Sequence, residues 1–75
     1  MKIEIHLFGK YRKYFNKTSF TKEFGENITP LGVAQSLGIP ATPSLWFLLN
    51  DAPTDGNEIL KDGDTLCIFE PVGGG

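Results

Sequence analysis

The segment TPLGVAQSLG, residues 29–38, predicts one short helix. Thr29 is a good N-cap, because its hydroxyl oxygen can accept a backbone hydrogen bond, and Pro30 suits the first helical position. Gly38 is placed to end the helix in a left-handed conformation. A helix of about two turns is unstable alone and needs a sheet beneath its apolar stripe. That stripe consists of Leu31, Val33, Ala34 and Leu37.

Strand patterns lie on both sides of this helix. Residues 2–8 alternate, with Ile3, Ile5 and Leu7 on one face, and residues 18–24 predict an edge strand. Residues 44–50 and 65–69 predict two further strands, joined by a short connection. A hairpin followed by a helical crossover and more strands gives a mixed sheet with the helix on one face. The expected fold is α+β, a single domain over residues 1–75 with four to five strands.

Two connecting segments carry apolar residues that should complete the core. The loop at residues 10–16 alternates basic and aromatic residues, and we interpret it as an amphipathic turn that packs Tyr14 or Phe15 on the core. Nucleic-acid binding by this loop is the weaker interpretation. In the second connection, Ile59 or Leu60 is expected to enter the core.

The strand at residues 44–50 is apolar on both faces. Leu45, Phe47 and Leu49 can face the helix, which leaves Trp46 and Leu48 on the opposite side of the sheet. A domain with one helix has no second layer to cover that side. Either a loop folds over Trp46 and Leu48, or a partner protein does.

Charge is distributed unevenly along this chain, whose net charge is −2. Six of its seven basic residues lie within the first 22 positions, and six of its nine acidic residues lie between positions 51 and 70. An acidic region next to the C-terminus would favour a basic partner and repel nucleic acid.

Composition also bears on the compartment and on side-chain chemistry. No apolar run approaches the roughly 20 residues of a membrane span, and residues 1–6 do not form the apolar region of a signal peptide. The single cysteine, Cys67, fits a reducing cytoplasm and is expected to be packed and unreactive. His6 has no neighbours at metal-ligand spacing, so no metal site is expected.

The last seven residues, FEPVGGG at positions 69–75, point to the working part of the chain. Pro71 lacks a backbone N–H and ends strand pairing. Gly73, Gly74 and Gly75 carry no side chains. We expect residues 70–75 to form a narrow, flexible tail that presents the α-carboxylate of Gly75.

Three motifs resemble the MoaD/ThiS family of ubiquitin-like, β-grasp sulfur carriers. Residues 7–12, LFGKYR, resemble the "LFA..R" stretch of MoaD-type members, residues 60–66, LKDGDTL, resemble "L.DGD.V", and residues 69–75 resemble "FPPVAGG". The resemblance covers nearly the whole chain. Glu70 stands where MoaD members commonly have proline, and Gly73 stands where they have a small residue. The first motif, Pro71 and the chain length favour MoaD over ThiS.

The resemblance implies a carrier rather than a stand-alone enzyme. A MoeB/ThiF-like adenylating enzyme would use ATP to activate the Gly75 carboxylate, and a persulfide protein would then supply the sulfur of a thiocarboxylate. The large subunit of molybdopterin synthase would receive that sulfur. Alternatives are the thiazole synthase of thiamine synthesis and ubiquitin-like attachment to proteins. No stably bound cofactor, nucleic acid or membrane is implied. The residues expected to contact partners are Phe69, Pro71, Val72, Gly73, Gly74, Trp46 and Leu48.

Overall fold

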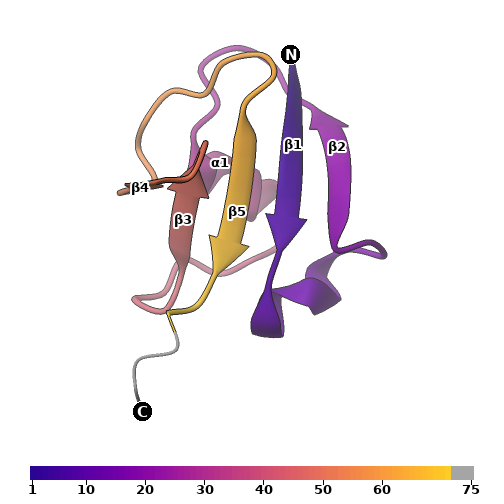
Figure 1. Ribbon diagram of the computed structural model, residues 1–75, viewed down its shortest axis with the longest axis vertical. Coiled ribbons are helices and arrows are strands. Elements are labelled where there is room, and N and C mark those ends of the chain that lie inside the picture. The colour runs from indigo at the N-terminus through magenta and orange to yellow at the C-terminus, as the bar shows by residue number, and fades with distance from the viewer. Residues whose placement is uncertain (72–75) are drawn as a thin grey trace.

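The computed structural model describes residues 1–71 and contains one five-stranded sheet with a helix against one face (Figure 1). The strand order is β2-β1-β5-β3-β4. The strands are β1 (Lys2–Leu7), β2 (Ser19–Glu23), β3 (Trp46–Leu49), β4 (Ala52–Thr54) and β5 (Thr65–Phe69). The helices are the 3-10 helix η1 (Gly9–Tyr14) and the α-helix α1 (Pro30–Ser36). The predicted α+β class, mixed sheet and single main helix are confirmed.

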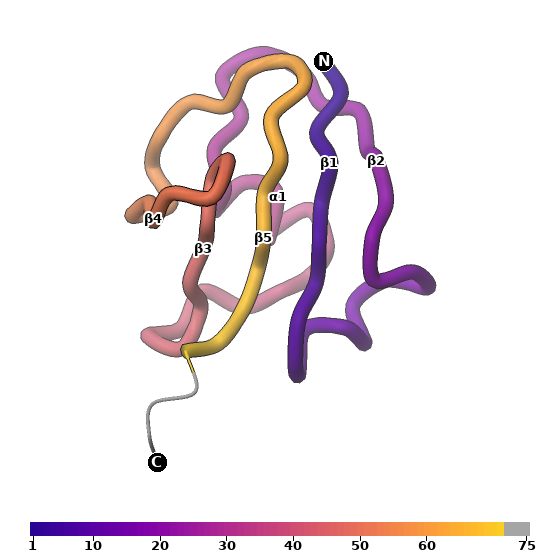
Figure 2. Tube along the Cα trace, viewed as in Figure 1, coloured from indigo at the N-terminus to yellow at the C-terminus, as the bar shows by residue number. Residues whose placement is uncertain are grey.

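Strand β5 occupies the centre of the sheet. It pairs in parallel with β1, with Glu4 opposite Thr65 and Leu7 opposite Ile68, and antiparallel with β3 on its other side. Strand β1 also pairs antiparallel with β2, which forms one edge as predicted. Figure 2 shows β1 and β5 side by side and running in the same direction. The last strand therefore ends beside the segment that follows the first strand.

The core lies between the sheet and α1. The predicted inward parity of β1 is confirmed, since Ile3, Ile5 and Leu7 are buried. Val33 and Ala34 of α1 cover them from the helix side. The other buried apolar residues of this core are Tyr11, Ile39, Phe47, Leu49, Leu60, Leu66 and Ile68. The sequence predicted that Ile59 or Leu60 enters the core, and the structure shows that Leu60 does so.

Helix α1 begins and ends as predicted. The Thr29 hydroxyl oxygen accepts a hydrogen bond from the Gly32 backbone N–H at 3.1 Å, and Gly38 has a φ of +80°. A Cβ at position 32 would lie 2.8 Å from Cδ1 of Ile28, so the end of that flexible side chain would have to shift to admit a larger residue.

Strand β4 was not predicted: its residues lie in the connection between the strands expected at 44–50 and 65–69, and Pro53 argues against strand pairing there. Asn50 and Asp51 both have positive φ, at 50° and 69°, which is the geometry of a two-residue type I′ hairpin turn. Leu49 pairs with Ala52 across this turn. Proline is acceptable in β4 because the strand lies at the sheet edge.

The packing predicted for the loop after β1 is confirmed for Tyr14 and wrong for Phe15, and the burial of Tyr11 was not predicted. Tyr11 is the residue of this loop that lies within the core, with only 2% of its surface exposed. Tyr14 is partly buried against the core, whereas Phe15 is exposed and stacks on Phe20 with ring centroids 3.9 Å apart. The cause is local: the segment forms the 3-10 helix η1, in which the Tyr11 N–H donates to the Phe8 carbonyl at 3.1 Å.

The structure also corrects the expected position of two of the acidic residues, whereas Asp51 and Glu70 do line the recess with Pro71. Asp62 and Asp64 precede β5 and lie at the opposite end of the sheet from its C-terminus. Their carboxylates accept backbone hydrogen bonds from Lys2 and Lys61, both at 2.7 Å. These aspartates stabilise a turn rather than surround the start of the tail. The neighbour of that start is the basic segment η1, because β1 and β5 are parallel.

The hydroxyl of Tyr11 is buried and has no hydrogen-bond partner among residues 1–71. Because an unsatisfied buried hydroxyl is unfavourable, we expect Tyr11→Phe to leave the free energy of unfolding unchanged or to raise it by up to about 1 kcal/mol. Tyr11→Ala should lower it by about 3–5 kcal/mol, because the ring leaves a cavity. Urea unfolding measures both. A loss above about 1 kcal/mol in Tyr11→Phe would show that the hydroxyl is hydrogen-bonded.

Candidate functional site

The face of the sheet opposite α1 carries apolar side chains at the end where β5 finishes. Strand pairing brings the outward residues together in rows. Trp46 pairs with Phe69, and Leu48 pairs with Cys67. Since residues of the same parity share a face, these four side chains lie on the side of the sheet away from the helix. Sequence parity predicted this position for Trp46 and Leu48.

An open recess of about 540 Å³ lies over this end of the sheet. It is lined by Phe8, Leu48, Asp51, Cys67, Phe69, Glu70 and Pro71. Three of the predicted partner-contacting residues, Leu48, Phe69 and Pro71, therefore share one surface. The sequence did not predict Phe8 and Cys67 as members of this surface. In the structure the side chain of Phe8 is 49% exposed. Their outward parity was readable in the sequence, but the pairing of β1 with β5 was not.

Trp46 borders this surface, and no loop within residues 1–71 covers it. Its side chain is 50% exposed, its indole N–H donates to the Pro43 carbonyl at 3.2 Å, and its ring lies 6.5 Å from that of Phe69. Of the two predicted ways to cover Trp46, the loop is therefore wrong. The hydrogen bond to Pro43 holds the N–H edge of the indole, while half of the side-chain surface stays exposed.

The remaining predicted site residues, Val72, Gly73, Gly74 and Gly75, lie outside the described residues. The described chain reaches Pro71, which lies on the recess two positions after β5 ends. The expectations for the glycine segment and for the Gly75 carboxylate therefore stay predictions.

The thiol of Cys67 is in an environment that keeps it protonated. Partial burial raises the pKa of the Cys67 thiol, and the nearby carboxylates of Asp51 and Glu4 raise it further. Because the thiolate is the nucleophilic form, this cysteine is a poor nucleophile. Its place in the recess is that of a small apolar side chain, in agreement with the sequence prediction.

An ion pair holds the residue between β5 and Pro71. The Lys10 ammonium lies 2.9 Å from a carboxylate oxygen of Glu70, and both side chains are substantially exposed. The hydrogen bond from Lys10 lowers the pKa of the Glu70 carboxyl, and the Ser44 hydroxyl lowers it further. The same hydrogen bond raises the pKa of Lys10. Glu70 is thus in contact with η1 on one side and with the segment before β3 on the other.

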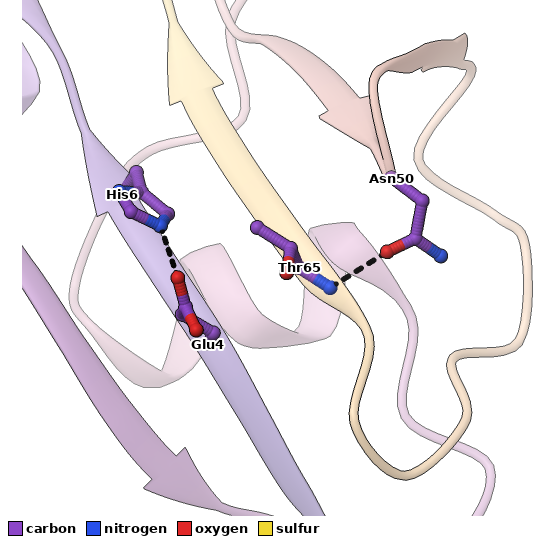
Figure 3. Close-up of polar contacts among 4 residues, drawn as sticks. All are labelled: Glu4, His6, Asn50 and Thr65. Carbon is purple, nitrogen blue, oxygen red and sulfur yellow. Dashed lines mark hydrogen bonds and ion pairs between the residues drawn. The ribbon is translucent and has the colours of Figure 1, made fainter.

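The other end of this face is polar. His6 lies 2.6 Å from the Glu4 carboxylate, and the Asn50 side-chain oxygen accepts a hydrogen bond from the Thr65 N–H at 2.9 Å (Figure 3). Residues 1–71 contain no group of three or more potential metal ligands. No helix among them is long and apolar enough to cross a membrane. The apolar end is therefore the better candidate for binding.

A family model described as the ThiS family matches residues 5–75. The chain belongs to the ThiS family. No curated protein matches its sequence.

Solved structures support this assignment of the ThiS-family chain. The HVO 2177 protein of Haloferax volcanii superimposes with a TM-score of 0.82 at 26% identity, over 100% of this chain and 87% of that one. A chain from the complex of subunits 1 and 2 of molybdopterin-converting factor from Helicobacter pylori gives 0.66 at 26% identity, over 100% of both chains. SAMP1 of Haloferax volcanii gives 0.79 at 18% identity, again over 100% of both, and shows the fold alone. The ubiquitin-like β-grasp fold expected for the family is thereby confirmed.

The Lys10–Glu70 pair gives this ThiS-family chain a testable pH response. Since the pKa of Glu70 is lowered in the folded chain, its stabilising contribution is present above the ordinary glutamate pKa and is lost as pH falls through the lowered value. At the alkaline end the contribution is lost as pH rises through the raised pKa of Lys10. We expect Lys10→Met to return the pKa of Glu70 towards its ordinary value, as followed by NMR of the side-chain carboxyl carbon.

Lys13→Met is the matched control for this titration, because Lys13 lies on the same 3-10 helix but pairs with the ring of Tyr14 instead, at 5.6 Å. It should leave the Glu70 titration as it is in the natural chain. An unchanged Glu70 titration in Lys10→Met would contradict the ion pair.

Proposed function

We propose that this chain is a sulfur carrier whose Gly75 carboxylate is adenylated and converted to a thiocarboxylate, which donates sulfur in molybdopterin synthesis. The observation that carries the proposal is the joint position of two features. An open apolar recess lies at the start of the tail, and the tail that continues from Pro71 ends in three glycines. Membership of the ThiS family supports the same function.

The chemistry follows from what the tail offers. A carboxylate is a poor electrophile, so a carboxylate oxygen of Gly75 must first attack the α-phosphorus of ATP, which releases pyrophosphate. The terminal sulfur of a persulfide protein then attacks the acyl carbon and AMP leaves. A second thiol cleaves the resulting acyl disulfide and releases the thiocarboxylate. Glycine beside the reacting carbonyl offers the least steric hindrance to two partner active sites.

The folded body serves to bind those partners. Trp46, Leu48 and Phe69 form an apolar surface where the chain leaves the sheet, and a large exposed aromatic is typical of a binding hot spot. The adenylating enzyme of the MoeB/ThiF type and the acceptor would use this surface in turn. ATP is then a substrate of the partner, and the carrier needs no cofactor of its own. A cytoplasmic location fits the single, free cysteine and the ATP requirement.

The likeness to the Helicobacter pylori molybdopterin-converting factor supports molybdopterin as the acceptor pathway. That protein was solved as a complex of subunits 1 and 2, so a large synthase subunit is the acceptor that we propose here. Transfer to a thiazole synthase is the second candidate, because the matching family model is that of ThiS. Attachment to proteins through the same activated glycine is the third, and the SAMP1-like fold is compatible with it.

The first test is activation of the terminal carboxylate by the ThiF-type adenylating enzyme of the same organism. The natural chain should support ATP–pyrophosphate exchange. A chain extended by one alanine after Gly75 should lose at least about 100-fold in rate, because the reacting carboxylate is displaced from the active site. A chain with Gly25→Ala, a position where a Cβ meets nothing within 4 Å, is the control and should react normally. Normal exchange by the extended chain, shown by its mass to be untrimmed, would contradict the proposal.

The second test concerns the apolar surface. Trp46→Ser should raise the KM for the carrier in the same exchange assay by about 10-fold or more while kcat stays unchanged, because a buried aromatic anchor is lost from the complex. Ile59→Ser is the matched control, since Ile59 is 51% exposed, as Trp46 is 50% exposed, but lies between β4 and β5 and, unlike Trp46, has no ring contact with Phe69. Equal effects of the two substitutions would exclude Trp46 from the binding surface.

A further inference from the structure

The loop after β1 carries four basic residues close to the start of the tail. Lys10, Arg12 and Lys13 lie on η1, and Lys17 follows shortly before β2. We call these four residues the basic strip. All four are exposed, and residues 9–18 include no acidic side chain. In the part of the chain that the structure describes, only Lys10 of the strip forms an ion pair, with Glu70.

Several contacts fix the basic strip beside the recess. Phe8, the residue before η1, lines the recess and donates its backbone N–H to the Ile68 carbonyl at 3.0 Å. Tyr11 is buried in the core, so the 3-10 helix cannot move freely away from the sheet. Figure 2 shows η1 at the same end of the molecule as the end of β5. The 3-10 helix that carries Lys10, Arg12 and Lys13 thus follows directly on a residue of the recess lining, and Lys10 contacts a second lining residue, Glu70.

The geometry points to an acidic surface, on the protein that adenylates the tail, as the partner of the basic strip. This inference rests on the proposed function, and it specifies that the adenylating enzyme presents negative charge to the basic strip. The recess lining contains two acidic residues, Asp51 and Glu70. Lys10 pairs with Glu70, whereas Asp51 lies in the turn between β3 and β4, near the start of β5. Arg12, Lys13 and Lys17 then remain as positive charge at the rim of an apolar contact. Rim charges of this kind accelerate association and orient the complex.

A nucleic acid is the other polyanion that a basic, aromatic loop can bind, and the structure disfavours it. Binding of single strands uses exposed aromatic rings on which bases stack. Here the ring of Tyr11 is buried, Tyr14 is partly buried against the core, and Phe15 is stacked on Phe20. The aromatic residues of the loop are thus engaged in packing, and its cations are left beside an apolar recess that suits a protein.

The test is a pair of charge-reversed variants with the same net charge. One is Arg12→Glu with Lys13→Glu, in the basic strip. The matched control is Lys2→Glu with Lys61→Glu, whose side chains are exposed at the opposite end of the sheet, by the Asp62 and Asp64 turn. Urea unfolding should confirm that both variants are folded. Their KM and kcat are then measured in ATP–pyrophosphate exchange with the ThiF-type enzyme, at low and at high salt.

At low salt we expect the Arg12/Lys13 variant to raise KM by about 10-fold or more with kcat unchanged, and the difference to shrink at high salt as the charges are screened. The control should change KM by less than about 2-fold. Equal KM changes in the two variants, or a natural-chain KM that does not depend on salt, would overturn the inference. Absence of any exchange with the natural chain would instead overturn the proposed function. Binding of a mixed-sequence single-stranded RNA that the Arg12/Lys13 variant alone abolishes, with its KM unchanged, would also overturn the inference in favour of nucleic acid.

Discussion

The parallel pairing of β1 with β5 is the constraint on which the rest of this structure depends. It joins the two ends of the sequence at the centre of the sheet, with Ile5 opposite Leu66 and Leu7 opposite Ile68. A parallel pair requires a crossover, and the segment between β2 and β3 supplies it with α1. The crossover covers one face of the sheet only, and within residues 1–71 no helix covers the other face.

The same pairing separates two kinds of polar chemistry. Because β5 runs in the direction of β1, its start lies at the acidic turn of Asp62 and Asp64, and its end lies at η1. The aspartates are used locally, since their carboxylates accept backbone hydrogen bonds in that turn. The basic residues of η1 make fewer such contacts and remain at the end from which the tail leaves. The direction of β5 thus places the basic residues of η1, rather than the Asp62 and Asp64 turn, beside the start of the tail.

Local signals in the sequence predicted most of the fold. Thr29 and Gly38 marked the helix, and alternation marked the inward face of β1, because capping and parity depend on neighbouring residues only. Strand β4 was missed because Pro53 argues against a strand unless its edge position is known. Tyr11 was missed because the sequence did not predict the 3-10 helix, whose three-residue period places Tyr11 on the same inward face as Tyr14.

The candidate site was predictable only where parity was enough. Trp46 and Leu48 were placed correctly on the open face, but Phe8 and Cys67 join the recess through pairing between segments far apart in sequence. Charge was misplaced for the same reason. The acidic residues between positions 51 and 70 are close to the tail in sequence. In the fold, the length of β5 separates Asp62 and Asp64 from the tail.

The central claim is that the backbone terminus, rather than any side chain, is the reacting group, and the raised pKa of the Cys67 thiol agrees with it. The most direct test is the intact mass of the chain after incubation with ATP, the adenylating enzyme and a persulfide donor, followed by fragmentation. The account predicts replacement of one oxygen by sulfur, located at Gly75. Addition of a sulfur atom at Cys67, or an unchanged mass despite an active enzyme, would contradict it.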